Sequence, residues 1–199
     1  MLRVTASLLN AFKYWQNNVD GEWGDSAYQS FIDTLSRKPF EPSDAMREGI
    51  EFERLCCAVA DGKETSDLPS VNDAADIIKG GVYQVRFEKV VTVDDKDYLL
   101  VGVADIVKGG VCMDLKHTSA WEAFKFADSP QTSSYFAGID GLTKFMYLIS
   151  ERNKEHLFIE VYYPEQVKPI EQFIKEFVDT ISGTELFDIY VQNWTVGGV

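Results

Sequence analysis

The hydrophobic residues in the first part of the chain recur at helical spacing. They predict a helix over residues 5–15, with Thr5 or Ser7 as its cap. Another helix is expected to begin at a cap formed by Ser43 or Asp44 and to end at Gly62. Two further helices are expected over residues 27–35 and 73–78. The N-terminal part of the chain is therefore expected to be helical.

The middle of the chain changes to the composition of strands. Three segments rich in β-branched and aromatic residues are separated by short turn sequences, Asp-Asp-Lys and Lys-Gly-Gly. They predict an antiparallel meander of three strands over residues 82–93, 97–107 and 110–118. A helix over residues 129–140 is expected next, because Ser129 can cap it and Pro130 suits its first turn.

The last part of the chain predicts two strands and one long helix. The strands are expected over residues 145–150 and 156–163, joined by a charged turn over 151–155, and the amphipathic helix over 164–190. A strand-rich centre flanked by helices predicts the α/β (α+β) class, with a central mixed sheet that contains the meander. The whole chain, residues 1–199, is expected to form a single domain.

Composition adds one constraint on function. The chain is 45% hydrophobic, which is typical of a globular protein, and it carries 19 basic residues against 32 acidic ones, a net charge of −13. Proteins that bind nucleic acid usually display a basic surface. A nucleic-acid enzyme of this composition must confine its basic residues to one groove, or rely on metal ions or on a partner.

We expect a cytoplasmic protein that does not enter a membrane. No apolar run has the length of a membrane span, and the N-terminus lacks the long apolar core of a signal peptide. The three cysteines, Cys56, Cys57 and Cys112, fit neither a disulfide framework nor metal-cluster spacing, so we expect them to be reduced.

Two aspartates are placed to share a metal ion. Asp105 interrupts a very apolar strand, and Asp114 begins the Asp-Leu-Lys sequence of the next strand, with eight residues between the two aspartates. A tight hairpin would bring the two carboxylates together, and alternation puts Lys116 on the same face as Asp114. Carboxylate oxygens suit Mg²⁺ or Mn²⁺, which can lower the pKa of an attacking water, and the lysine can act on that water or on a phosphate oxygen.

Polar residues on two helices complete the pattern. Glu51 or Glu53 offers a further oxygen ligand, and Gln131 and Tyr135 lie one turn apart on one helix face. The segments Gly49–Glu53, Gly102–Asp105, Asp114–Lys116 and Gln131–Tyr135 follow in the order that resembles the PD-(D/E)XK nuclease superfamily, in its RecB, lambda-exonuclease and CRISPR-adaptation-exonuclease branch. The opening sequence from Thr5 to Phe12 is similar to the first helix of that branch, so the resemblance spans about residues 5–140.

The resemblance implies a restriction-endonuclease-like core and a metal-dependent deoxyribonuclease, with an exonuclease of phage or bacterial recombination or repair as the expected activity. It implies that Glu53, Asp105, Asp114 and the carbonyl of Leu115 bind Mg²⁺ or Mn²⁺. Lys116 would act on the water or the scissile phosphate, and Gln131 and Tyr135 would support the site. The expected substrate is DNA, with a single-strand annealing protein or further copies of the chain as partners. Four cysteines that hold an iron–sulfur cluster in some family members are absent here.

Plainer interpretations stay open at the level of sequence. Each motif alone is weak, since Asp114 and Lys116 could be a solvated pair and Glu53 a surface carboxylate. A non-catalytic nucleic-acid-binding or protein-interaction module with the same fold is the alternative that the negative charge favours.

Gln84 and Glu88 could be accessory groups, but we interpret them as ordinary strand residues. We interpret His117 as structural or peripheral and His156 as solvated in a charged turn. Core packing is the expected role of three aromatic residues that could otherwise stack on bases: Trp121, Phe124 and Phe126.

Overall fold

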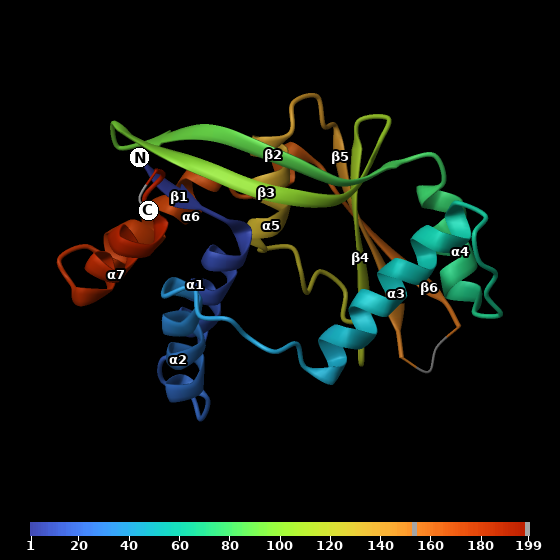
Figure 1. Cartoon of the computed structure of the whole chain (residues 1–199), viewed down its shortest axis with the longest axis horizontal. Coiled ribbons are helices and arrows are strands. Elements are labelled where there is room, and N and C mark those ends of the chain that lie inside the picture. Colours follow the sequence, from blue (N-terminus) through green and yellow to red (C-terminus); the bar gives the residue numbers. More distant parts are fainter. Residues whose placement is uncertain (153–154, 198–199) are drawn as a thin grey trace.

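A computed structural model describes residues 1–152 and 155–197 of the chain. Its centre is a mixed six-stranded sheet in the order β1-β3-β4-β5-β6, and β2 also pairs with β3 (Figure 1). The strands are β1 (Leu2–Val4), β2 (Val82–Val93), β3 (Lys96–Lys108), β4 (Val111–Thr118), β5 (Lys144–Glu151) and β6 (Leu157–Tyr162). The predicted α+β class, with a mixed sheet and an antiparallel meander flanked by helices, is confirmed.

Helices cover both faces of the sheet. They are α1 (Ala6–Asn18), α2 (Gly24–Leu35), α3 (Asp44–Ala60), α4 (Pro69–Ile78), α5 (Pro130–Gly138), α6 (Ile170–Ile181) and α7 (Glu185–Trp194). Alternate residues of β4 enter different hydrophobic clusters, because successive side chains of a strand point to opposite faces. Met113 and Leu115 pack with α3 and α4, whereas Cys112 belongs to the larger cluster with α1, α2, α6 and α7.

The pairing of β3 creates a fork in the sheet. The first part of β3 pairs in parallel with β1, over Tyr98–Leu100, and its last part pairs with β4 through Ile106–Lys108. Beyond Ile106 the two strands separate, whereas β4 pairs with β5 along its whole length. The fork, by which we mean the point of separation beside Asp105 and Asp114, is where the polar residues of the meander gather.

The predicted caps of two helices are present. The Thr5 hydroxyl accepts from the backbone N–H of Leu8, and the Ser43 hydroxyl accepts from that of Met46. Helix α4 begins at Pro69, four residues before the predicted start at position 73, because a proline suits the first turn of a helix. Strand β1 was not predicted, since three residues carry too little alternation to mark a strand.

The prediction of one long helix over residues 164–190 is wrong. The segment contains a 3₁₀ turn (Pro164–Gln166), then α6, then α7. Helix α6 begins only after Pro169, and it ends before Gly183, whose φ of 76° is left-handed and interrupts the helix. Thr184 then caps α7. The reversal lets Phe177 of α6 pack against Tyr190 of α7, with ring centres 4.9 Å apart.

Two further predictions fall partly on residues that the structure does not describe. The predicted charged turn over residues 151–155 includes positions 153 and 154, which lie outside the described residues, as do positions 198 and 199 of the expected single domain. Within the described residues, every helix is too short or too polar to cross a bilayer.

Candidate active site

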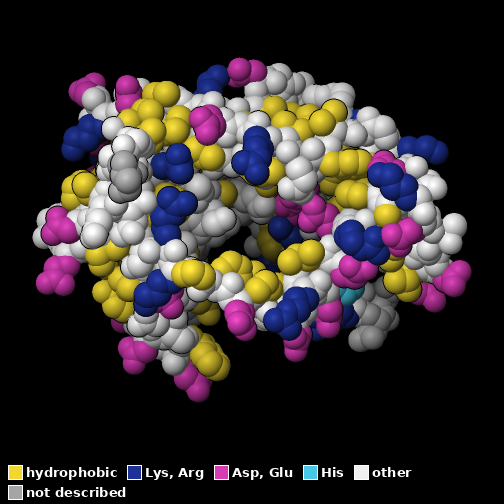
Figure 2. All heavy atoms as spheres, in the orientation of Figure 1, with side chains coloured by type: hydrophobic (Ala, Val, Ile, Leu, Met, Phe, Trp, Pro, Cys, Tyr) yellow, Lys and Arg dark blue, Asp and Glu magenta, His cyan; other side chains and the backbone are white. Residues whose placement is uncertain are grey.

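A cavity of about 800 Å³ opens at the fork between β3 and β4. Figure 2 shows the hollow at the centre of one face of the molecule, with acidic and basic side chains at its floor. The cavity is bounded by the start of α1, the first turns of α3, the second half of β3, β4 and α5. All seven residues that the sequence singles out line it: Glu53, Asp105, Asp114, Leu115, Lys116, Gln131 and Tyr135.

Asp114 is the most buried carboxylate of the cavity, with 1% of its surface exposed. It continues the register in which Ile106 pairs with Met113, so it faces Asp105 across the fork. Its Oδ2 lies 2.7 Å from the Nζ of Lys116, and its Oδ1 accepts a hydrogen bond of 2.6 Å from Gln131. Oδ1 is therefore oriented by a hydrogen bond, whereas the buried Oδ2 has the ion pair but no hydrogen bond among the described residues.

Gln131 and Tyr135 form a polar ridge on α5. The amide nitrogen of Gln131 donates to the Tyr135 hydroxyl over 2.9 Å, and that hydroxyl donates to the carbonyl of Val103 over 3.2 Å. The Nζ of Lys116 donates to Gln131 Oε1 over 3.4 Å. The two residues therefore tie α5 to β3 and β4.

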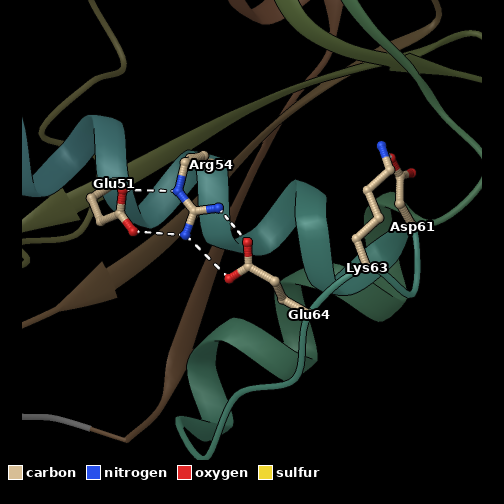
Figure 3. A network of polar contacts seen from close by, with 5 residues as sticks. All are labelled: Glu51, Arg54, Asp61, Lys63 and Glu64. Atoms are coloured by element: carbon tan, nitrogen blue, oxygen red, sulfur yellow. Dashed lines mark hydrogen bonds and ion pairs between the residues drawn. The ribbon is translucent and has the colours of Figure 1, made fainter.

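Glu53 enters the cavity from α3 on the other side of the fork. Its Oε1 accepts a hydrogen bond of 2.9 Å from the amide of Gln84, a β2 residue with a left-handed φ of 52°. Glu51 lies on a different face of the helix, where both of its oxygens bind Arg54 at 2.8 and 2.9 Å (Figure 3). Arg54 also binds Glu64, so Glu51 belongs to a surface network and Glu53 to the cavity.

The electrostatics of the cavity are dominated by crowded carboxylates. Burial, followed by the charges of Asp114 and Glu53, raises the pKa of Asp105 to about 8. Burial and Asp114 also raise the pKa of Glu53 above its ordinary value. Burial opposes the charge of Lys116, but the adjacent Asp114 carboxylate outweighs it and raises the pKa of that amine. With all four groups ionised, three negative charges meet one positive charge.

The carboxylates of the cavity are ligands that suit a hard divalent cation, but they do not lie close enough together to bind one. Carboxylate oxygens are the ligands that Mg²⁺ and Mn²⁺ prefer, and the excess negative charge at the fork would be balanced by such an ion. In the part of the chain that the structure describes, no three His, Cys, Asp or Glu side chains lie close enough to hold a metal. Glu53 is instead held through its Oε1 by the amide of Gln84.

The aromatic residues near the site divide into packed and exposed ones. Trp121 stacks on Phe158 with ring centres 4.2 Å apart, and Phe126 packs against Tyr147 at 4.8 Å. Phe124 is 74% exposed, so the core packing expected of it is wrong. His117 stacks on Phe52 on the face of β4 away from Lys116, while Glu88 and His156 are exposed.

Two features of the site were missed from the sequence. Gln84 was expected to be an ordinary residue, yet it orients Glu53, and only its left-handed backbone sets it apart. Phe87 was not considered, although its ring lies over Gly102 and Gly138, where an added Cβ would come within 2.3 and 2.1 Å of it. Gly102 and Gly138 are the signal that could have indicated such close packing, because a glycine leaves room for a neighbouring side chain.

Comparison with solved structures shows similarity to the protein in the crystal structure of SSO0001, with a TM-score of 0.53 and 11% sequence identity. The similarity covers 93% of this chain and 79% of that chain. At so low an identity the likeness shows the fold alone, and it extends over nearly all of the chain. No family model matches the sequence, and no curated protein matches it.

Proposed function

We propose that the chain is a metal-dependent deoxyribonuclease that hydrolyses DNA phosphodiester bonds at the fork. The observation that carries the proposal is the convergence of Glu53, Asp105 and Asp114 with Lys116 in one cavity, from a helix and two strands. An uncompensated buried charge is costly, so a cluster of this kind calls for a cation. The spacing of the four motifs, and their resemblance to PD-(D/E)XK nucleases, supports the same activity.

Each residue has a role that follows from its position. Asp105, Asp114, Glu53 and the Leu115 carbonyl would hold Mg²⁺ or Mn²⁺, which supplies Lewis acidity and a more acidic bound water. Lys116 keeps its proton beside Asp114, so it is suited to hold a phosphate oxygen or to orient the water. Gln131 and Tyr135 fix Asp114 and Lys116 in place through their hydrogen bonds.

The finer proposal is an exonuclease that acts in phage or bacterial recombination or repair, in the cytoplasm of the host cell. Three free cysteines are compatible with a reducing compartment. A single-strand annealing protein or a ring of identical chains are the proposed partners. A strict monomer that degrades DNA with full processivity would exclude the ring.

Cleavage of end-labelled linear DNA and closed circular DNA tests the proposal. We expect loss of the linear form alone, in Mg²⁺ or Mn²⁺ but not in a chelator, and abolition of cleavage by Lys116→Ala. The control is Lys96→Ala, which alters an exposed lysine at the tip of the β2–β3 hairpin. Cleavage of the circular form would show that the enzyme is an endonuclease and not an exonuclease.

A second candidate is a non-catalytic module that binds nucleic acid or protein. Two observations favour it, namely the net charge of −13 and the hydrogen bond that holds Glu53 on Gln84. Binding of a divalent ion by the wild-type chain, with no cleavage of any DNA or RNA form, would decide for this alternative.

A further inference from the structure

A second groove leaves the active-site cavity on the side of Lys116 and Gln131, which line both. It runs between α1 and the loop that precedes α5, and it is lined by Asn10, Lys13, Tyr14, Asn17, Lys125 and Asp128. Lys13 is paired with Asp128 and Lys116 with Asp114, so among the described ion pairs Lys125 is the lysine of the groove left without a carboxylate, in a chain whose net charge is −13. Its position and its charge suit the phosphates that adjoin a scissile bond.

The loop over residues 119–129 is held firmly although it has no regular structure. The buried carboxylate of Glu160 on β6 accepts hydrogen bonds from the Trp121 indole over 2.9 Å and from the backbone N–H of Phe124 over 3.0 Å. Its other oxygen accepts from the Tyr162 hydroxyl over 2.7 Å. One carboxylate therefore fixes the loop against the sheet at two points.

Phe124 is held in a strained and exposed position. Its φ of 64° lies in the left-handed region, which is costly for an aromatic residue, and its ring is 74% exposed. The next residue, Lys125, is exposed and lines the groove. Backbone strain that keeps a large apolar ring in solvent indicates a ligand for that ring.

We infer that this loop and α1 form a binding site for single-stranded nucleic acid that leads into the active site. Phe124 stacks on an unpaired base, while Lys125 holds a phosphate of the same strand. Stacking on an exposed ring requires a base that is free of its partner, which favours a single strand over a duplex. The inference names a substrate form for the proposed nuclease and rests on that function.

Binding of a fluorescent oligothymidylate of about twelve nucleotides tests the inference, since single-strand sites span roughly 4–16 nucleotides. Affinity is measured by anisotropy in Ca²⁺, with a gel to verify that the strand stays intact. We expect Phe124→Ala to weaken binding by about tenfold. Lys125→Gln should lower the slope of log affinity against log salt by about 0.7, the loss of one phosphate contact.

Two control variants test whether the loss of any exposed ring or any exposed lysine would weaken binding. Phe40→Ala removes a ring that is 70% exposed on the α2–α3 connection, and Lys96→Gln removes a lysine at the hairpin tip. Both should bind as the wild type does, and all four variants should keep its melting temperature. Wild-type affinity in Phe124→Ala and Lys125→Gln, tighter binding of a duplex of the same length, or no binding of nucleic acid at all would each overturn the inference.

The binding experiment and the cleavage experiment can fail separately. If the wild type degrades DNA while the loop variants bind normally, the nuclease stands and the groove is refuted. If the wild type binds the strand through the loop but cleaves no DNA in Mg²⁺ or Mn²⁺, the groove stands and the nuclease is refuted.

Discussion

At Asp105, burial and neighbouring negative charges act in the same direction. Both favour the protonated carboxyl, so the pKa of Asp105 is raised to about 8 from an ordinary value of 3.8. A raised pKa means that the folded state binds the proton more tightly than the unfolded state does. The ionised form of Asp105 therefore destabilises the metal-free fold, and this loss grows as pH rises from about 4 to about 8.

The variant Asp105→Asn removes the ionisation while it keeps the shape of the side chain. In a chelator, we expect the variant to gain melting temperature relative to the wild type as pH is raised from 5 to about 8. Thermal unfolding at the two pH values measures the difference. Addition of Mg²⁺ should stabilise the wild type more than the variant, because the ion binds the ionised carboxylate. Identical pH dependence in both proteins would contradict the burial of Asp105.

Sequence could predict which residues meet at the fork but not how each is held. Asp105 was conspicuous because it interrupts an apolar strand, and the Asp114–Lys116 pair followed from strand alternation. The bond between Gln84 and Glu53 joins residues of β2 and α3 that are 31 positions apart, and no local pattern encodes such a contact.

At the scale of elements, the ring of Phe87 sets the distance between β2, β3 and α5. It packs beside Gly102 of β3 and Gly138 at the end of α5, and it meets the Tyr135 ring edge-on at 6.0 Å. The same contact brings α5, with Gln131 and Tyr135, close to the strand that carries Asp105. The two glycines are therefore needed for the packing that shapes the cavity.

Two glycine substitutions should have opposite effects on stability. Gly102→Ala places a Cβ 2.3 Å from the Phe87 ring, and we expect a loss of about 1–3 kcal/mol in the free energy of unfolding. Gly49→Ala on α3 meets no atom within 4 Å, so it should gain roughly 0.5–1 kcal/mol from helix propensity. Urea denaturation of both variants measures the effects, and a neutral Gly102→Ala would refute the close packing.

Long elements with a clear period were predictable, and short or interrupted ones were not. The strand over residues 82–93 has the bounds predicted for it, because its β-branched and aromatic residues end at clear turn signals. The break between α6 and α7 was missed because apolar residues continue at helical spacing on both sides of Gly183. The separation of β3 from β4 could not be predicted, since it depends on pairing with β1 and β5.

At the scale of the whole molecule, the charge distribution determines how DNA can approach. The chain is acidic overall, and its cavity concentrates three carboxylates around one lysine. Phosphates are repelled from such a cavity unless a cation occupies it. Substrate binding and metal binding should therefore be linked.

We expect the affinity of the wild-type chain for single-stranded DNA to be about tenfold lower in a chelator than in millimolar Ca²⁺. The variant Asp114→Asn should show a smaller difference, because it removes one charge from the cavity. Anisotropy titrations at one ionic strength measure both. Equal affinity in chelator and Ca²⁺ would show that the cavity does not contribute to DNA binding.

The proposal of a metal-dependent nuclease is tested most directly by the rate of cleavage of linear DNA in Mn²⁺. The rate is compared among the wild type, Asp114→Ala and Asp114→Asn. Asp97→Ala serves as the control, since Asp97 is an exposed carboxylate near the hairpin tip. We predict cleavage by the wild type and the control, and a loss on the order of 10³-fold or more in both Asp114 variants. Cleavage at the wild-type rate by a folded Asp114 variant, or intact DNA after incubation with the folded wild type, would refute a metal-dependent nuclease centred on Asp114.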